Sequence, residues 1–258
     1  MDALALGSLV LAGMVGGALN SVAGGGSFIV FPTLVLAGVT PVSANATTTV
    51  GLWPASTASA YAYRRELPKD RRLVVALSLA SLVGGLAGAL LLLGTSDATF
   101  ARLVPFLIAA AAALFTFGPR LQKRLRAEAP AVTGPLPMPR VITAALVQIV
   151  IATYGGYFGG GMGILMLATF SLVGLSDMHA MNGLKNVLGA ILNGVALVLF
   201  LAAREVQFLP AAAVAIGGVV GGYGGASLAR RVSAERVRTG VVVFAWSMAI
   251  YFAVRAYA

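Results

Sequence analysis

The sequence has 258 residues, of which 59% are hydrophobic and only 10% are charged. Soluble domains carry about 25% charged residues, so this composition excludes a soluble enzyme. The formal net charge is +10, but the cations gather in short loops between apolar blocks, which argues against nucleic acid as a partner. Cysteine is absent and there is one histidine, so we expect no disulfide, no metal site and no cofactor.

Eight apolar blocks make up most of the chain. A helix needs about 20 apolar residues to cross a hydrocarbon core of about 30 Å, and each block reaches or exceeds this length. The blocks span residues 4–38, 43–63, 73–93, 99–117, 141–174, 179–203, 208–229 and 237–256. The first and the fifth are too long for one crossing, and glycine runs interrupt both. The pattern predicts an all-α polytopic membrane protein.

Positive charge predicts the orientation of the chain, because loops rich in Lys and Arg stay in the cytoplasm. Fourteen of the eighteen cations lie in three loops: Arg64, Arg65, Lys69, Arg71 and Arg72; Arg120, Lys123, Arg124, Arg126 and Arg140; Arg230, Arg231, Arg236 and Arg238. With these loops inside, both termini fall outside. The first block then starts and ends outside, and the fifth starts and ends inside.

Each half of the chain is therefore a hairpin followed by three crossings. The odd number of net crossings turns the second half upside down, which predicts two inverted repeats. We expect these repeats at residues 1–117 and 141–258, joined by a basic, Pro-rich cytoplasmic linker at residues 118–140.

Two short matches between the halves support a duplication. Residues 23–29 (AGGGSFI) align with residues 158–164 (FGGGMGI), and residues 45–50 (NATTTV) align with residues 182–187 (NGLKNV). Both matches fall at the same place in each half, although chance similarity between glycine-rich helices is the alternative. The symmetry is partial, since Met162 stands where the first copy has Ser27.

The glycine runs of the two long blocks are candidate anion sites. The arms that follow them, residues 27–37 and 162–173, rise only roughly 17 Å at 1.5 Å per residue, so each hairpin is expected to enter the membrane without crossing it. A glycine run before a helix leaves unpaired N–H groups at the positive end of the helix dipole, where anions bind. The candidates are Gly24, Gly25, Gly26 and Ser27 in the first copy, and Gly159, Gly160 and Gly161 in the second. The alternative is close helix packing, which we expect for the other paired glycines.

Block 179–203 carries a polar stripe. Asn182, Lys185, Asn186 and Asn193 recur at three- and four-residue steps or their sums, which places them on one helical face. Charges inside membranes are costly and usually functional, and Lys185 has no acid in its own segment. We expect it to bind an anion, unless it snorkels to the cytoplasmic boundary or pairs with Asp177.

The equivalent face of block 43–63 carries Asn45, Thr48, Thr49 and Ser56, which can donate to an anion or instead satisfy helix carbonyls. Asn20 and Ser21, just before the first glycine run, are further candidates for the same site.

These features together resemble the TauE/SafE sulfite-exporter family of membrane permeases. The resemblance rests on the glycine hairpin, residues 31–34 (FPTL), residues 44–48 (ANATT), and the second copy with Asn182, Lys185 and Asn193. It implies export of sulfite, organosulfonates or other small sulfur-containing or organic anions across the cytoplasmic membrane.

No Asp or Glu lies well inside an apolar block, so carboxylate-based coupling to protons or sodium lacks a residue. We therefore expect a transporter, not an enzyme, in which the membrane potential or a secondary gradient drives the anion out. An anion channel with the same site and a membrane assembly protein remain as alternatives. The expected partners are a small anionic substrate and the lipid bilayer, and the sequence leaves a homo-oligomer open.

Overall fold

The computed structural model is helical throughout, with no strand, over the residues it describes, which are 3–22, 25–128, 134–228 and 234–257. Its helices are α1 (Ala3–Val22), α2 (Ser27–Leu36), α3 (Pro41–Ala62), α4 (Arg71–Leu93), α5 (Asp97–Glu128), α6 (Met138–Tyr157), α7 (Met162–Leu172), α8 (Met178–Ala202), α9 (Phe208–Leu228) and α10 (Ala234–Tyr257). Within the described ranges, six helices are long and apolar enough to cross a membrane: α1, α4, α5, α6, α8 and α10. The predicted all-α polytopic membrane fold is confirmed.

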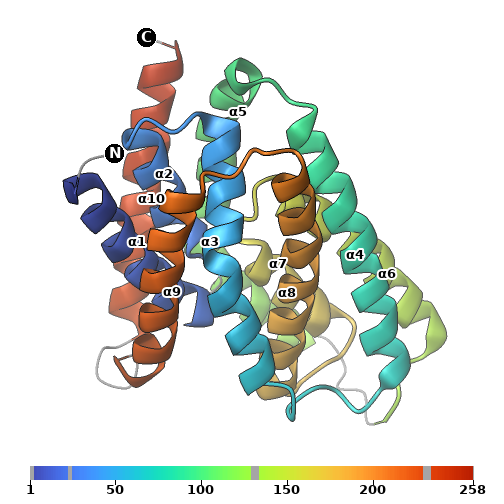
Figure 1. Cartoon of the computed structure of the whole chain (residues 1–258). Coiled ribbons are helices and arrows are strands. Elements are labelled where there is room, and N and C mark those ends of the chain that lie inside the picture. The colour runs from blue at the N-terminus through green and yellow to red at the C-terminus, as the bar shows by residue number, and fades with distance from the viewer. Residues whose placement is uncertain (1–2, 23–24, 129–133, 229–233, 258) are drawn as a thin grey trace.

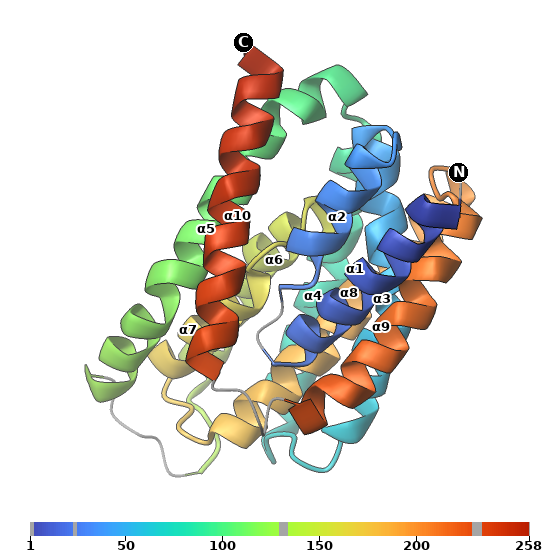
Figure 2. The ribbon, with the colours of Figure 1, turned by 90° about the vertical axis from the view of Figure 1, so that its left-hand side faces the viewer.

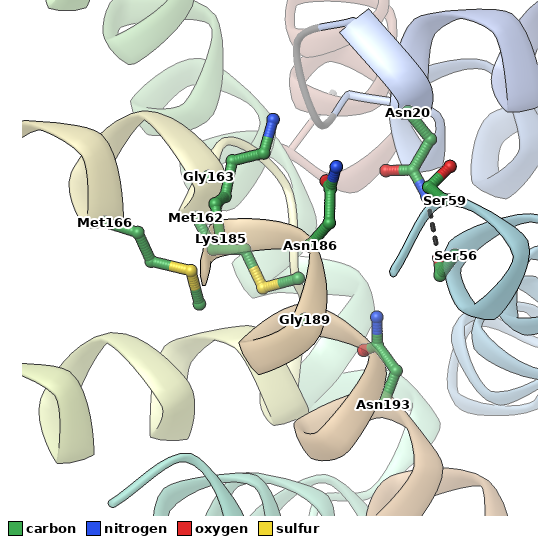
Figure 3. A pocket seen from close by; sticks show the side chains of 10 residues that line it. All are labelled: Asn20, Ser56, Ser59, Met162, Gly163, Met166, Lys185, Asn186, Gly189 and Asn193. Atoms are coloured by element: carbon green, nitrogen blue, oxygen red, sulfur yellow. Dashed lines mark hydrogen bonds between the residues drawn. The ribbon is translucent and has the colours of Figure 1, made fainter. Parts of the chain in front are cut away.

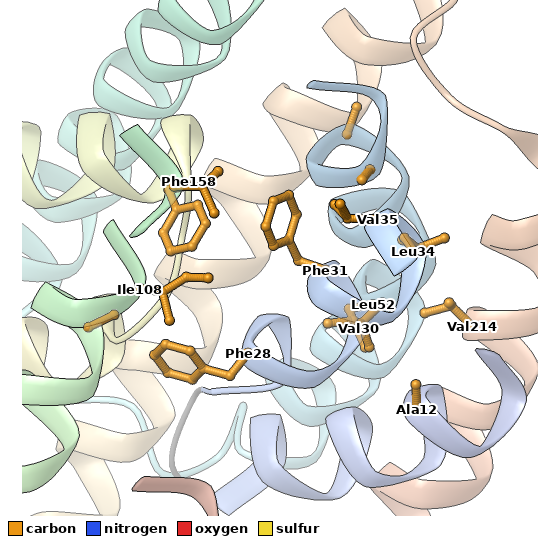
Figure 4. Packing of buried hydrophobic residues seen from close by; sticks show 14 of the residues in the cluster. Ala12, Phe28, Val30, Phe31, Leu34, Val35, Leu52, Ile108, Phe158 and Val214 are labelled. Atoms are coloured by element: carbon orange, nitrogen blue, oxygen red, sulfur yellow. The ribbon is translucent and has the colours of Figure 1, made fainter. Parts of the chain in front are cut away.

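Two helical hairpins interrupt the bundle of long helices. The short arms α2 and α7 have 10 and 11 residues, and their ends agree with the predicted arms to within one residue. α1 ends and α2 begins partway along the bundle, and the same holds for α6 and α7 (Figures 1 and 2). The hairpins touch in the interior, where the ring of Phe31 in α2 lies 5.8 Å from that of Phe158 between α6 and α7 (Figure 4).

The start of α1 and the end of α10 lie toward the same end of the bundle, together with the connection at residues 203–207 (Figure 1). The connections at residues 63–70 and 173–177 lie at the opposite end. This agrees with the parity that the charged loops predict, whereas the side of the membrane that each end faces stays a prediction.

The pairing of helices has an internal symmetry. When α1 to α5 are exchanged with α6 to α10, the α1–α9 contact becomes the α4–α6 contact, and α3–α9 becomes α4–α8. The α5–α7 contact becomes α2–α10, while α3–α8 and α5–α10 map onto themselves. The inverted repeat stays a prediction, and this pairing is the observation that favours it.

Glycines let two of these helix pairs approach closely. A Cβ atom on Gly17 of α1 would lie 2.2 Å from the carbonyl oxygen of Gly218 in α9, and one on Gly88 of α4 would lie 2.1 Å from that of Thr153 in α6. No side chain fits there, so small residues are required for the contact. The packing role expected for these paired glycines is confirmed.

Helix α5 runs further than its apolar block, which ends at residue 117, and continues to Glu128. The added residues are 118–128 (GPRLQKRLRAE). After Gly118 and Pro119 they are mostly strong helix formers, which explains why the first part of the predicted linker is helical. Residues 129–133 lie outside the described residues. At the end of the linker, the amide of Leu136 donates to Asp70 Oδ2 at 2.9 Å, and the other oxygen of Asp70 caps α4.

Candidate functional site

A pocket between α1, α3, α7 and α8 gathers polar side chains inside the bundle. Its lining residues are Asn20, Ser56, Ser59, Met162, Gly163, Met166, Lys185, Asn186, Gly189 and Asn193. Between its atoms and across its open mouth it spans about 410 Å³, of which about 30 Å³ can hold the centre of a water-sized sphere. Figure 3 shows α8 in the middle, the α1 and α3 residues on one side, and the α7 residues on the other.

Lys185 is the charged group of this pocket. Its side chain extends from α8 and is only 5% exposed, so it does not snorkel to the membrane boundary. No carboxylate pairs with it among the described residues. Asp177 instead caps α8 by accepting hydrogen bonds from the amides of His179 and Ala180 at 2.9 and 3.4 Å. A buried ammonium without a protein counter-ion is costly, and an anion in the pocket would balance it.

The N-terminus of α7 borders the same pocket. The chain turns into α7 through Gly159 and Gly161, whose φ angles of +82° and +77° are left-handed conformations that glycine adopts without strain. The amide of Ile164 donates to the Gly161 carbonyl, but the amides of Met162 and Gly163 have no backbone acceptor within the described residues. These two residues line the pocket, so the positive end of the α7 dipole faces it.

Neutral donors complete the lining. Asn20 Nδ2 donates to Ser56 Oγ at 2.9 Å, which links the end of α1 to α3 across one side of the pocket. Asn186 Nδ2 is buried and has no hydrogen-bond acceptor among the described residues. Asn193 lies about two turns beyond Asn186 on the same face of α8. An ammonium, free helix amides and carboxamides form a donor set suited to the oxygens of an anion, and the described lining residues include no carboxylate or imidazole.

Of the predicted polar residues, Asn20, Ser56, Lys185, Asn186 and Asn193 line the pocket, and the other described polar candidates are not among its lining residues. Those lie in contacts of other kinds: Asn45 Nδ2 donates to the Tyr157 carbonyl at 3.0 Å, Thr48 and Thr49 donate to Ala44 and Asn45 carbonyls, and Asn182 donates to the Met178 carbonyl. The two threonines therefore follow the alternative in which hydroxyls satisfy their own helix. Ser27 is half-buried at the start of α2.

The predicted glycines lie in close helix contacts or in the turns of the two hairpins. A Cβ on Gly25 would lie 2.5 Å from the ring of Phe115, and one on Gly26 would lie 2.4 Å from the Gly16 carbonyl. In the second hairpin, Gly160 accepts a hydrogen bond from the Tyr154 hydroxyl at 2.6 Å, while Gly159 and Gly161 shape the turn that presents α7. Gly24 and the side chain of Ser21 lie outside the described residues.

Sequence reasoning did not select Ser59 and Met166 for the site. Ser59 lies three residues beyond Ser56 on the same face of α3, and Met166 lies four residues beyond Met162 on α7. Helical spacing would have found both, once one member of each pair was known to face the pocket.

Comparisons with known proteins agree with this architecture. The family model "Sulfite exporter TauE/SafE" matches residues 9–252. A "Probable membrane transporter protein" of Haemophilus influenzae is 25% identical over 249 residues, which cover 96% of this chain and 93% of that protein. The "Probable membrane transporter protein YfcA" of Escherichia coli K12 is 27% identical over 244 residues, which cover 93% and 86%.

The "Probable membrane transporter protein ORF9" of a Sinorhizobium species is 32% identical over 178 residues, which cover 67% of this chain and 63% of that protein. No solved structure gives a significant match. Because the family model spans residues 9–252, nearly the whole length, the chain belongs to the TauE/SafE family of membrane transporters.

Proposed function

We propose that this membrane transporter exports a small anion, such as sulfite or an organosulfonate, by way of the pocket between α1, α3, α7 and α8. One observation carries the proposal. Lys185 is an ammonium on a membrane helix, 5% exposed, which lines a cavity and has no acidic partner among the described residues. Buried charges in membranes are paired or lie on substrate pathways, and an anionic substrate supplies the missing partner.

The neighbouring groups suit the oxygens of such an anion. The free amides of Met162 and Gly163 can donate to one side of it, as amides at helix N-termini do for phosphate and sulfate. The buried Asn186 Nδ2 has a donor to spare. The cavity around Lys185 also favours transport over a role as a membrane assembly protein, because assembly requires no polar space inside the bundle.

The membrane potential is sufficient to drive export. Asp70, Asp97, Asp177 and Glu205 lie at helix ends or in connections, so none of them offers a carboxylate at mid-membrane for ion coupling. An inside-negative potential favours the exit of each negative charge by about 2.3 kcal/mol per 100 mV. The proposed driving force is therefore the potential itself.

The test is anion flux in liposomes that contain the purified protein. Sulfite and methanesulfonate should cross faster than in empty liposomes, and glycerol should not. Lys185→Ala should lower anion flux about 10- to 100-fold, since a charge-assisted hydrogen bond contributes about 1.5–3 kcal/mol. Lys69→Ala is the matched control, because it removes the same charge from an exposed loop.

Normal flux in a well-inserted Lys185→Ala protein would remove Lys185 from the site and refute the proposed mechanism. The same liposomes separate a carrier from a channel. A carrier saturates with anion concentration and accelerates when the opposite side holds the same anion, whereas a channel shows no such counter-transport.

A further inference from the structure

The charge balance of the pocket limits the substrate that it can hold. Lys185 is the one ionised side chain among the described residues that line it; all other lining residues are amides, hydroxyls, methionines or glycines. The pocket therefore offers a single full positive charge.

The helix dipoles do not add a second charge. The N-terminus of α7 contributes roughly +0.5 of an elementary charge at Met162 and Gly163. On the opposite side, α1 ends at Val22, two residues beyond Asn20, so the end with roughly −0.5 of a charge lies near that wall (Figure 3). These two partial charges largely cancel, and the fixed charge of the site stays near that of the ammonium.

We propose that the pocket selects monoanions over dianions of the same shape. This rests on the proposed function, because it concerns the same site. A monoanion neutralises Lys185, so the loaded pocket carries no net charge. A dianion leaves one negative charge that no described group in the pocket can balance, and an unbalanced charge away from water is strongly disfavoured.

The proposal narrows the substrate class. Hydrogensulfite and simple alkylsulfonates each carry one negative charge and meet the requirement. The sulfite dianion, sulfate, and sulfonates that also carry a carboxylate have two negative charges and do not meet it. Each cycle would thus move one negative charge, and sulfite would leave as its protonated form.

Three tetrahedral sulfur compounds of similar size isolate the effect of charge: dimethyl sulfone is neutral, methanesulfonate is a monoanion and sulfate is a dianion. Their binding to the purified protein can be measured by thermal stabilisation and by competition with sulfite flux in liposomes. Methanesulfonate should bind on the order of 100-fold more tightly than sulfate, which corresponds to a free-energy difference of about 2.7 kcal/mol.

Variants that change the charge of the pocket should shift this preference in opposite directions. Lys185→Gln should weaken the binding of methanesulfonate until its affinity equals that of dimethyl sulfone. Asn193→Lys adds a second cation to the lining and should shift the preference toward sulfate; Ser59→Lys on the other wall is the substitute if that variant is unstable. Gln207→Lys, in an exposed connection, is the control that adds the same charge elsewhere.

Two kinds of failure are distinguishable. Equal affinity of the parent protein for methanesulfonate and sulfate would overturn the charge selectivity and leave the proposed anion transport standing. Absence of both binding and flux for every anion would overturn the proposed function as well.

Discussion

The contact between α1 and α9 predicts a sharp difference between two glycines of the same helix. In Gly17→Ala, the new methyl carbon would lie 2.2 Å from the Gly218 carbonyl oxygen, where ordinary contacts begin at 3.4 Å. The two helices must therefore separate locally by about 1.2 Å, the difference between these distances. Gly17 lies three residues before Asn20, so the shift also disturbs the hydrogen bond of 2.9 Å from Asn20 to Ser56 at the pocket.

The expected loss of stability is the sum of these two effects. Overpacking of this kind costs about 1–3 kcal/mol of stability, and loss of the hydrogen bond adds about 0.5–1.5 kcal/mol. Gly7→Ala is the matched control, because nothing lies within 4 Å of a Cβ atom there. It should be neutral or stabilise α1 by up to about 1 kcal/mol, since alanine is the better helix former.

Thermal unfolding in detergent, together with anion flux in liposomes, tests the pair. Gly17→Ala should unfold at a lower temperature than the parent protein and transport more slowly, whereas Gly7→Ala should be at least as stable as the parent and transport equally fast. Equal stability and flux of the two variants would refute the conclusion that backbone contact between α1 and α9 supports the pocket.

Two further predictions concern the interior and the orientation. Gln148 Nε2 donates to Ser81 Oγ at 2.8 Å between α6 and α4, and both side chains are fully buried. Ser81→Ala should therefore lower the free energy of unfolding by about 1–3 kcal/mol, because it leaves the buried Gln148 amide without its acceptor. Adding Gln148→Leu should restore part of this lost stability. If the losses of the two single variants simply add in the double variant, the two side chains do not bond directly. The absence of native cysteine permits clean labelling, so Ser96→Cys should react with an impermeant maleimide on intact cells and Lys69→Cys only after permeabilisation. The opposite result would reverse the predicted orientation.

The hairpins and the charged stripe were predictable because each depends on local sequence. Three consecutive glycines disfavour a continuous helix, so α2 and α7 agree with the predicted arms to within one residue. Positions on one helical face follow from the residue spacing alone, which brought Lys185, Asn186 and Asn193 together before their surroundings were known. The stripe predicted from this spacing also included Asn182. That residue lies near the start of α8, and its side chain donates to the Met178 carbonyl of its own helix.

The composition of the opposite wall was only partly predictable, because it depends on how the helices cross. The predicted face of α3 included Asn45, Thr48 and Ser56, and of these Ser56 lines the pocket, together with Ser59. Which turn of a helix meets a neighbour is set by packing, and here the close contacts of α1 with α9 and of α3 with α8 decide it. No pattern within α3 itself contains that information.

The difference between the two halves explains why the pocket holds one charge. Lys185 aligns with Thr48 in the internal match, and Thr48 is 1% exposed and bonded to the Ala44 carbonyl. The first glycine turn likewise packs against α5, where Phe28 and Phe115 stack edge to face with ring centroids 5.1 Å apart, while the second turn leads into α7 beside the pocket. A protein with two identical halves would place two lysines and two helix N-termini around its centre and would suit a dianion. Because the second half supplies Lys185 and the first half supplies neutral donors, this pocket can balance a single negative charge.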